Sequence, residues 1–245
     1  MKAVLVTGAS GGIGEALCAG FHGAGWRVIA TDFRKSKPSL ADAYIDADLE
    51  TLATDDGALA AFKRQVQAAL NGAKLAALVN NAAVQLLGRA ESVSAKDWER
   101  TMRINLSAPF RLVQTFLSDL EAENGVVVNV GSVHAQATKP GFVSYATSKA
   151  AIHGLTRALA VDLGPRLRVV CLAPAAVATP MLLAGFADNA EAMADLAKMH
   201  PIGRLAQPAE IAEAAVAIAD KPFLFSTGST FWLDGGILSR LHDPL

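Results

Sequence analysis

Residues 145–149 read Tyr-Ala-Thr-Ser-Lys, which places a phenol four residues before an ammonium. Side chains at this spacing lie on one face of a helix, about 5–6 Å apart at Cβ. An ammonium that close favours the phenolate and lowers the pKa of the tyrosine from its reference of about 10. Tyr145 and Lys149 therefore suit proton transfer, although the same spacing is also common on ordinary helix surfaces.

A glycine-rich stretch, Thr7 to Gly14, follows an apolar run and precedes a helical pattern. Its glycines Gly8, Gly12 and Gly14 permit a tight turn and a close approach of the backbone to a pyrophosphate. The N–H groups at the start of the helix can bind that anion. An ordinary glycine-rich turn is the alternative, but the position after the first strand of an alternating series favours a nucleotide loop.

Asp32 ends the second apolar run, about twenty residues beyond the loop, where dinucleotide-binding folds carry an acidic residue. A carboxylate there accepts hydrogen bonds from an adenosine ribose and repels a 2′-phosphate, which favours NAD over NADP. The alternative is an aspartate that only caps a turn or helix. Four nearby cations can soften the preference for NAD: Arg27, Arg34, Lys35 and Lys37.

The positions of these residues depend on short apolar runs that alternate with helical patterns. Such runs, nearly continuous in apolar residues, are typical of parallel strands covered on both faces, so we expect an α/β protein with a doubly wound parallel sheet. No repeat or linker divides the chain, which predicts one domain over residues 1–245. The expected strands are 3–8, 26–31, 43–46, 75–80, 125–130, 167–172 and 229–234, and the expected helices are 12–24, 57–71, 95–120, 144–163 and 208–219.

The composition is that of a globular protein, with 52% hydrophobic and 18% charged residues and a net charge of −1. This gives no electrostatic reason to expect nucleic acid or a membrane as partner. The uncharged stretch 169–187 is interrupted by Pro174 and Pro180, and the amino terminus leads directly into a strand with no signal peptide. The cysteines and histidines show no metal-ligand spacing, so no metal is expected. We therefore expect a cytoplasmic protein.

Taken together, these motifs resemble the single-domain short-chain dehydrogenases/reductases in order and spacing. The resemblance rests on the glycine loop, Asn80-Asn-Ala-Ala83, Asn105, Ser132, the Tyr-x-x-x-Lys pair and Trp232-Leu-Asp-Gly-Gly236, and it covers essentially the whole chain. It implies a Rossmann-type sheet of about seven parallel strands, a nicotinamide cofactor, a small-molecule substrate and usually a homotetramer.

The resemblance also implies a role for each residue of a catalytic tetrad. Tyr145 would be the acid/base, with its phenolate favoured by Lys149 and by the oxidised nicotinamide. Lys149 would also hold the nicotinamide ribose. Ser132 would bind the substrate oxygen, and Asn105 would keep a water beside the lysine for proton relay. Taken singly, the serine would be an ordinary turn residue and the asparagine a cap or surface amide.

Cofactor binding is assigned by the same resemblance. Many NADP-dependent members carry Arg or Lys where this chain has Gly11, which again favours NAD. Two departures are Ala83 and Ala175, each in place of a usual glycine, and the second bears on the backbone near the nicotinamide carboxamide. The implied cofactor residues are Gly8, Ser10, Gly12, Ile13, Gly14, Asp32, Asp48, Leu49, Asn80, Ala82, Tyr145, Lys149, Pro174, Val177 and Thr179.

The substrate pocket is expected to include Gln85, Ser132 and His134. Gln85 and His134 resemble part of the carboxylate-binding set of 3-hydroxybutyrate dehydrogenases. Phe142 stands where that set has a lysine, and Lys139 is only a loose substitute. An uncompensated carboxylate is costly to bury, which favours a neutral or hydroxyl-bearing substrate. The alternative is that Gln85 and His134 are solvated loop residues.

The sequence therefore predicts an NAD(H)-dependent oxidoreductase that interconverts a secondary alcohol and a ketone. The alternatives are a hydroxy-acid dehydrogenase of the 3-hydroxybutyrate type and a 3-oxoacyl-thioester reductase. In a different class stands a Rossmann-fold protein that senses nicotinamide without turnover, and the complete tetrad argues against it. Residues 181–205 resemble a substrate-covering lid, although their apolar side chains would equally suit a helix packed on the domain.

Overall fold

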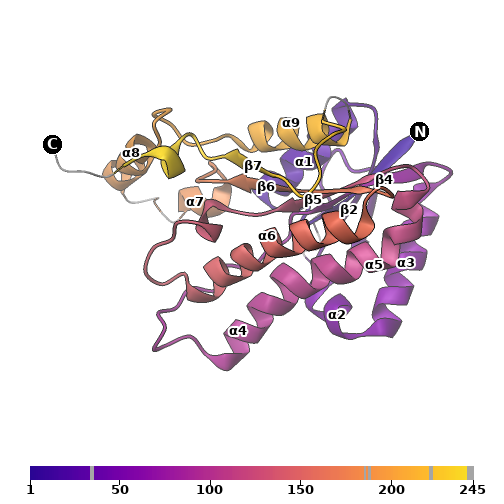
Figure 1. Ribbon diagram of the computed structural model, residues 1–245, viewed down its shortest axis with the longest axis horizontal. Coiled ribbons are helices and arrows are strands. Elements are labelled where there is room, and N and C mark those ends of the chain that lie inside the picture. The colour runs from indigo at the N-terminus through magenta and orange to yellow at the C-terminus, as the bar shows by residue number, and fades with distance from the viewer. Residues whose placement is uncertain (34–35, 185, 187–188, 221–222, 242–245) are drawn as a thin grey trace.

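The computed structural model describes residues 1–33, 36–184, 186, 189–220 and 223–241. Within these residues the strands form one parallel sheet in the order β3-β2-β1-β4-β5-β6-β7 (Figure 1). The predicted doubly wound sheet of seven parallel strands is confirmed. The strands are β1 Lys2–Thr7, β2 Arg27–Asp32, β3 Ala43–Asp46, β4 Lys74–Asn80, β5 Val126–Val130, β6 Arg168–Pro174 and β7 Thr230–Leu233.

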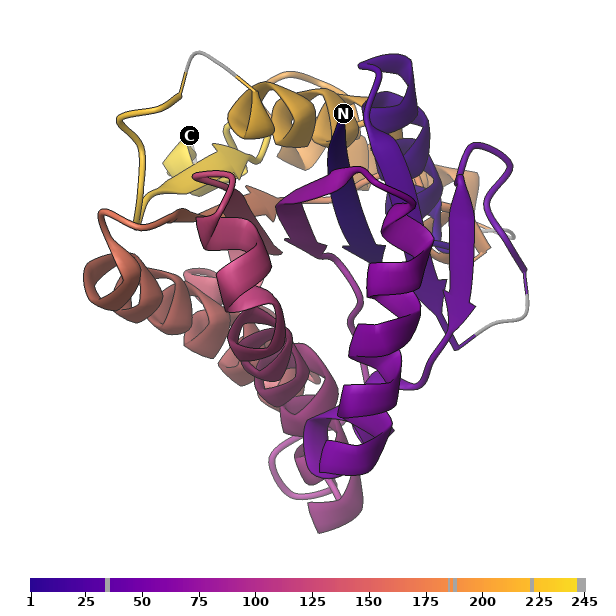
Figure 2. The same cartoon turned by 90° about the vertical axis from the view of Figure 1, so that its right-hand side faces the viewer.

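Helices cover both faces of the sheet. Helices α1 and α9 pack on one face, while α3, α5 and α6 pack on the other (Figures 1 and 2). No helix of the described residues is long and apolar enough to cross a membrane. The helices are α1 Gly12–Gly23, α2 Leu49–Thr54, α3 Asp56–Leu70, α4 Ala95–Met102, α5 Ala108–Glu121, α6 Val143–Leu163, α7 Pro180–Ala184, α8 Ala190–Met199 and α9 Pro208–Ala219.

The strands are buried on both faces, which explains their nearly continuous apolar sequences. In β1, Val4 and Val6 join the cluster beneath α1 and α9, while Leu5 joins the cluster on the other face. The chain winds outward from β1 to β3 and then returns to place β4 on the other side of β1. This reversal creates a topological switch point at the carboxyl ends of β1 and β4, where folds of this type bind their ligands.

The helix expected over residues 95–120 is interrupted, which corrects the prediction of one continuous element. Residues Arg103–Ser107 form a π-helical turn between α4 and α5, and Pro109 lies in the first turn of α5. A π turn has a hydrogen-bond ring one residue longer than an α-helix and often marks a functional site. The helices α2 and α7 were not predicted, because segments this short show too little periodicity to be recognised. The helix α8 lies within residues 181–205, for which a lid or a helix packed on the domain was expected.

Candidate active site

The glycine loop between β1 and α1 is shaped by close backbone contacts. Gly8 has a φ of +63°, and a Cβ added at Gly14 would lie 2.1 Å from the carbonyl oxygen of Gly8. Only glycine is compatible with these two positions. Gly11, the residue before α1, makes no side-chain cap, so the first amides of the helix can bind an anion. The loop thus has the form required for a dinucleotide pyrophosphate.

The end of β4 holds this loop in place. The Asn81 side-chain amide donates to the carbonyl oxygens of Thr7 and Gly8, at 2.9 and 3.0 Å. The Thr7 hydroxyl oxygen accepts from the backbone N–H groups of Asn81 and Ala82, both at 3.1 Å. Asn80, which the sequence analysis named, instead donates to Asn129 across the sheet. Thr7 and Asn81 were not among the predicted site residues, although two adjacent asparagines at the end of a strand are a recognisable signal.

Asp32 stands at the far side of the loop, at the end of β2. Its carboxylate accepts the backbone N–H of Ser10 at 3.0 Å, and the Tyr44 hydroxyl donates to its carbonyl oxygen. The Asp32 side chain therefore lies against the glycine loop. Asp48, also expected to contact the cofactor, is the N-cap of α2, where its carboxylate accepts the backbone N–H of Glu50. This hydrogen bond gives Asp48 a structural role in starting the helix.

Of the cations expected near Asp32, Arg27 donates to the carbonyl oxygen of Ala69 at 2.8 Å. Its guanidinium is thereby held against the end of α3. Arg34 and Lys35 lie outside the described residues.

The loop after β6 packs against the start of α1, next to the glycine loop. The N–H of Ala175 donates to the carbonyl oxygen of Leu233 at 3.1 Å, and its φ is not in the left-handed region. Alanine is thus accommodated there without strain. A Cβ added at Gly12 would lie 3.0 Å from Cβ of Thr179, so this loop packs on the glycine loop. Val177 is buried and forms a parallel β-bridge with Ala206.

Tyr145 and Lys149 lie on one face of α6, next to the end of β5. The Lys149 ammonium is 5.6 Å from the centroid of the Tyr145 ring and donates to the carbonyl oxygen of Val130 at 2.7 Å. Ser132 follows β5 and is buried. The Ser132 hydroxyl lies near enough to the Tyr145 hydroxyl to act on the pKa of the phenol. The structure thus brings together three members of the expected tetrad.

The ionisation of this group differs from the sequence-based prediction. Burial raises the pKa of Tyr145, and its hydrogen bond to Ser132 only partly opposes this. Burial also lowers the pKa of Lys149 to about 8, against a small opposing effect of Cys171. The pKa of Tyr145 therefore stands above its reference value, whereas the spacing alone predicted a value below it. Desolvation outweighs the attraction, and the ammonium bonds to a carbonyl rather than to the phenol.

Asn105, the fourth member of the tetrad, lies in the π turn. Its side-chain oxygen accepts the N–H of Val84 at 2.8 Å. Its amide nitrogen donates to the carbonyl oxygen of Val84 and to the hydroxyl of Ser148, both at 2.9 Å. These three bonds join the loop after β4 to α6. The side chain is thus a brace between two walls of the site, and the expected water-holding role is not one that its bonds indicate.

His134 lies beside the proposed acid/base. Its ring stacks on Phe142 at a centroid distance of 4.5 Å and meets Tyr145 edge-on at 5.7 Å. Its Nδ1 is 2.9 Å from the hydroxyl of Thr138. Burial lowers the pKa of His134, and the charge of Lys139 acts in the same direction. A neutral imidazole therefore borders the space in front of Tyr145.

Two other expectations for the pocket concern Lys139 and Gln85. The ammonium of Lys139 lies 4.9 Å from the centroid of Phe142, so the fold brings a cation to the residue that replaces the expected lysine. Gln85 is exposed on the loop after β4. The helix α8, at the same end of the molecule, contributes no buried side chain among its described residues, as expected for a cover rather than a core layer (Figure 1).

The described residues hold no cluster of three or more His, Cys, Asp or Glu that suits a metal ion.

The class of Rossmann-type oxidoreductases is defined by three features that this structure combines. They are a doubly wound parallel sheet, a glycine loop at its switch point and a Ser–Tyr–Lys group at its carboxyl edge.

Comparison with known proteins agrees with this class. A family model described as enoyl-(acyl carrier protein) reductase matches residues 8–238. The acetoacetyl-CoA reductase of an Acinetobacter species is 32% identical over 96% of this chain and 97% of its own. The D-threitol dehydrogenase of Mycolicibacterium smegmatis is 34% identical over 96% of this chain and 92% of its own.

Among solved structures, the aldohexose dehydrogenase of Thermoplasma acidophilum superimposes with a TM-score of 0.89 and 28% identity, covering 100% of this chain and 96% of its own. The chain belongs to the short-chain dehydrogenase/reductase family, whose members act on alcohol and ketone substrates. Related structures are complexes with NADH in one case and with NADP in another, so the likeness does not choose between the two cofactors.

Proposed function

We propose that this protein is an NAD(H)-dependent oxidoreductase that interconverts a secondary alcohol and a ketone. The observation that carries the proposal is the buried group of Ser132, Tyr145 and Lys149 at the carboxyl end of β5, on the sheet edge that also carries the glycine loop. The nicotinamide, when bound, exchanges a hydride with the carbinol carbon. Tyr145 exchanges the matching proton with the substrate oxygen, and Ser132 bonds to that oxygen.

The ionisation states at neutral pH suit the reductive direction. A raised pKa keeps Tyr145 protonated, so the phenol is ready to donate its proton to a developing alkoxide. A pKa of about 8 keeps most of Lys149 charged at pH 7, and the ammonium stabilises negative charge on the phenol oxygen. In the oxidative direction Lys149 favours the phenolate, and a bound oxidised nicotinamide would add its positive charge to this effect.

The experiment that tests this role compares the two tyrosines of the chain. Tyr145→Phe removes the hydroxyl and keeps the ring, so turnover should be lost while NADH binding, followed by its fluorescence, persists. Tyr44→Phe is the control, because Tyr44 lies on β3, away from Ser132 and Lys149, and its hydroxyl donates to the Asp32 carbonyl oxygen. Retained turnover in Tyr145→Phe would refute the mechanism.

The preference for NAD is supported by two features. The Asp32 carboxylate lies at the end of β2 next to Ser10, and Gly11 provides no side-chain cation. A 2′-phosphate bound there would face this carboxylate and be repelled by it. Steady-state kinetics with both cofactors test the preference, and a higher kcat/KM with NADP would contradict it.

A neutral, hydroxyl-bearing substrate is favoured by the residues in front of Tyr145. Phe142 is apolar and His134 is held neutral, so neither offers a charge to a carboxylate. Similarity to a D-threitol dehydrogenase and an aldohexose dehydrogenase supports a polyol or sugar. The proximity of Lys139 to Phe142, and the similarity to an acetoacetyl-CoA reductase, favour a second candidate, an anionic 3-oxoacyl substrate.

These two candidates are separated by assaying tetritols and hexitols against 3-hydroxybutyrate and acetoacetyl-CoA. The first candidate predicts that the polyols have the higher kcat/KM and that Lys139→Ala does not change it. If an anionic substrate is turned over efficiently, and Lys139→Ala reduces that turnover, the anionic 3-oxoacyl substrate replaces the polyol or sugar.

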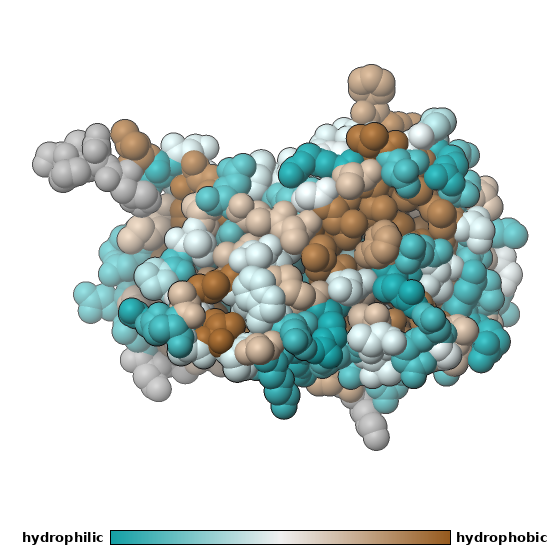
Figure 3. All heavy atoms as spheres, turned by 60° about the horizontal axis from the view of Figure 1, so that its bottom comes forward, coloured by the Kyte–Doolittle hydropathy of each residue, from teal (hydrophilic) through white to brown (hydrophobic). Residues whose placement is uncertain are grey.

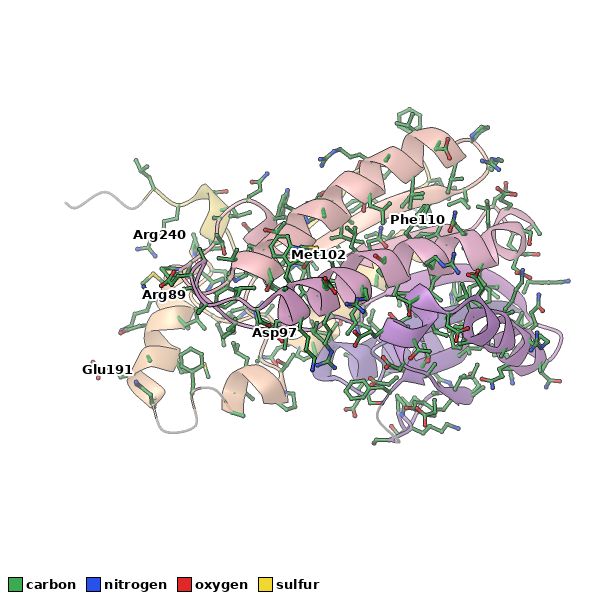
Figure 4. The ribbon with its side chains drawn as sticks, turned by 90° about the horizontal axis from the view of Figure 1, so that it is seen from below. Arg89, Asp97, Met102, Phe110, Glu191 and Arg240 are labelled. Atoms are coloured by element: carbon green, nitrogen blue, oxygen red, sulfur yellow. The ribbon has the colours of Figure 1, made fainter. Side chains whose placement is uncertain are left out.

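A homotetramer is also part of the proposal. Helices α4, α5 and α6 expose Trp98, Phe110 and Val161, and Figure 3 shows apolar side chains gathered over α5 and α6. Figure 4 shows Met102 and Phe110 on the same underside of the molecule. Large apolar side chains on a helical face are typical of subunit contacts. Light scattering should give four times the chain mass of 25.5 kDa, and a monomeric mass would reject the proposal.

The cytoplasm remains the proposed location. Cys18 and Cys171 are both buried as free thiols, which suits a reducing compartment.

A further inference from the structure

A third polar side chain follows Tyr145 and Lys149 along α6 at the same spacing. His153 lies one turn beyond Lys149, so the three residues share a face of the helix. The imidazole is buried, with 6% of the residue exposed. The mechanism proposed above gives it no role.

The surroundings of His153 fix its ring but leave one nitrogen without a bond. The ring packs against Trp232 at a centroid distance of 5.3 Å, and Nδ1 is 3.4 Å from the hydroxyl of Thr230. Both residues belong to β7, so α6 is tied here to the edge of the sheet. Nε2 is buried and has no hydrogen-bond partner among the described residues. Such a nitrogen costs free energy that an apolar side chain would avoid, and it calls for an explanation.

The nitrogen lies directly against the backbone at the end of β5. A Cβ added at Gly131 would be 2.4 Å from Nε2 of His153 and 2.6 Å from Sγ of Cys171. No side chain fits at Gly131 unless its neighbours shift. The imidazole of His153 and the thiol of Cys171 therefore pack directly against Gly131.

This contact matters because Gly131 stands between two functional positions. The carbonyl oxygen of Val130 accepts a hydrogen bond from the Lys149 ammonium, and Ser132 carries the hydroxyl that acts on the pKa of Tyr145. A shift of Gly131 moves the lysine's acceptor and the serine together, relative to the phenol on α6.

The charge of the imidazole is also constrained. Burial lowers the pKa of His153 to about 4, and the positive charges of Arg157 and Lys149 on the same helix act in the same direction. The other titratable group that faces it is Cys171 on β6, whose pKa burial raises to about 11. At neutral pH both groups are uncharged, so neither competes with Lys149 for its carbonyl or repels its ammonium.

We infer that His153 is a positioning residue of the active site: its neutral imidazole supports Gly131 and thereby sets the places of Ser132 and Lys149 relative to Tyr145. The inference rests on the proposed oxidoreductase function. It gives a role to a buried ring with an unpaired nitrogen that the proton-transfer steps leave unused.

The test compares His153→Ala, which removes the support, with His153→Gln, which keeps a polar group at a similar reach. Leu159→Ala is the matched control, because Leu159 is buried on α6, six residues beyond His153. This substitution creates a cavity in the hydrophobic cluster between α6 and the sheet, away from Gly131. We expect His153→Ala to lower kcat roughly ten- to hundredfold, since displacements of about 1 Å can have that effect. His153→Gln should recover much of the loss, and Leu159→Ala should lower Tm with little change in kcat.

The pH profile separates positioning from stability. If Lys149 is displaced from Tyr145, the phenolate loses stabilisation and the acid limb of kcat for alcohol oxidation moves to higher pH in His153→Ala. A variant that is merely less stable keeps the wild-type limb.

A double-mutant cycle tests the contact itself. Gly131→Ala should abolish most activity in the wild-type background, and should cost less in His153→Ala, where one of its two clashes is gone. If His153→Ala keeps the wild-type kcat and pH profile while Tyr145→Phe is inactive, the inference about His153 is overturned and the proposed function stands. An active Tyr145→Phe would instead overturn the proposed function.

Discussion

Replacement of Lys149 by methionine should abolish turnover without destabilising the protein. Methionine keeps the length and apolar stem of the lysine but carries no charge. Lys149 is 4% exposed, and burial lowers its pKa from its usual value of 10.5 to about 8. A shift of this size corresponds to about 3 kcal/mol by which the folded state disfavours the charged form.

The loss of the hydrogen bond opposes this gain. The Lys149 ammonium donates to the carbonyl oxygen of Val130 at 2.7 Å, and a buried acceptor left without its partner costs about 1–3 kcal/mol. The sum predicts that Lys149→Met is between equally stable and about 2 kcal/mol more stable than the wild type at pH 7.

The difference between the two proteins should depend on pH. Below pH 8 the lysine is protonated in both the folded and the unfolded chain, so its full penalty is present. Between about pH 8 and 10.5 the folded state loses the proton while the unfolded state keeps it, and wild-type stability rises by about 3 kcal/mol. The methionine variant lacks this rise, so its relative stability should fall as pH increases.

The assay is urea unfolding of both proteins at pH 7 and pH 9.5, followed by circular dichroism. Other groups titrate in this range, but their effects are common to both proteins and cancel in the comparison. A methionine variant that is more than about 2 kcal/mol less stable at pH 7, with a deficit that does not vary with pH, would refute the reasoning. It would mean that the ammonium is not desolvated as the structure indicates.

Three further substitutions test other parts of the site. Gly14→Ala should raise KM for NAD at least roughly tenfold, because the new Cβ would lie 2.1 Å from the Gly8 carbonyl oxygen, and initial-rate kinetics would show it. Asp32→Ala should narrow the ratio of kcat/KM for NAD over NADP, since it removes the carboxylate that repels a 2′-phosphate; an unchanged ratio would exclude that role. Asn105→Ala should lower the unfolding free energy by about 2 kcal/mol or more and also reduce kcat, because both backbone groups of Val84 lose their partner; urea unfolding and steady-state rates measure the two effects.

Much of the architecture could be predicted from the sequence because it is encoded locally. Buried parallel strands are nearly continuous runs of Val, Leu, Ile and Ala, and the predicted strands match β1 to β7 within two residues. The glycine loop was also recognisable, since its positions need a conformation and a space that only glycine allows. The short helices α2 and α7 carry too few turns for such a signal.

The candidate site was recognisable only as a set of residue types at family spacing. The sequence placed Tyr145 and Lys149 on one helix face and Ser132 at a strand end, and the structure brings them together. It named Asn80 but not Asn81, because the bonds from Asn81 to the loop run between residues more than seventy positions apart.

The tertiary structure alone decided the electrostatics and the support of the site. Whether Lys149 lowers the pKa of Tyr145 depends on how far both are desolvated, and burial is a property of the folded chain rather than of spacing. The contact of His153 with Gly131 likewise joins a helix and a strand through space. Sequence determined which groups are available and on which elements they lie. Packing determined their distances and their exposure to water, and these two quantities set their charge and their reach.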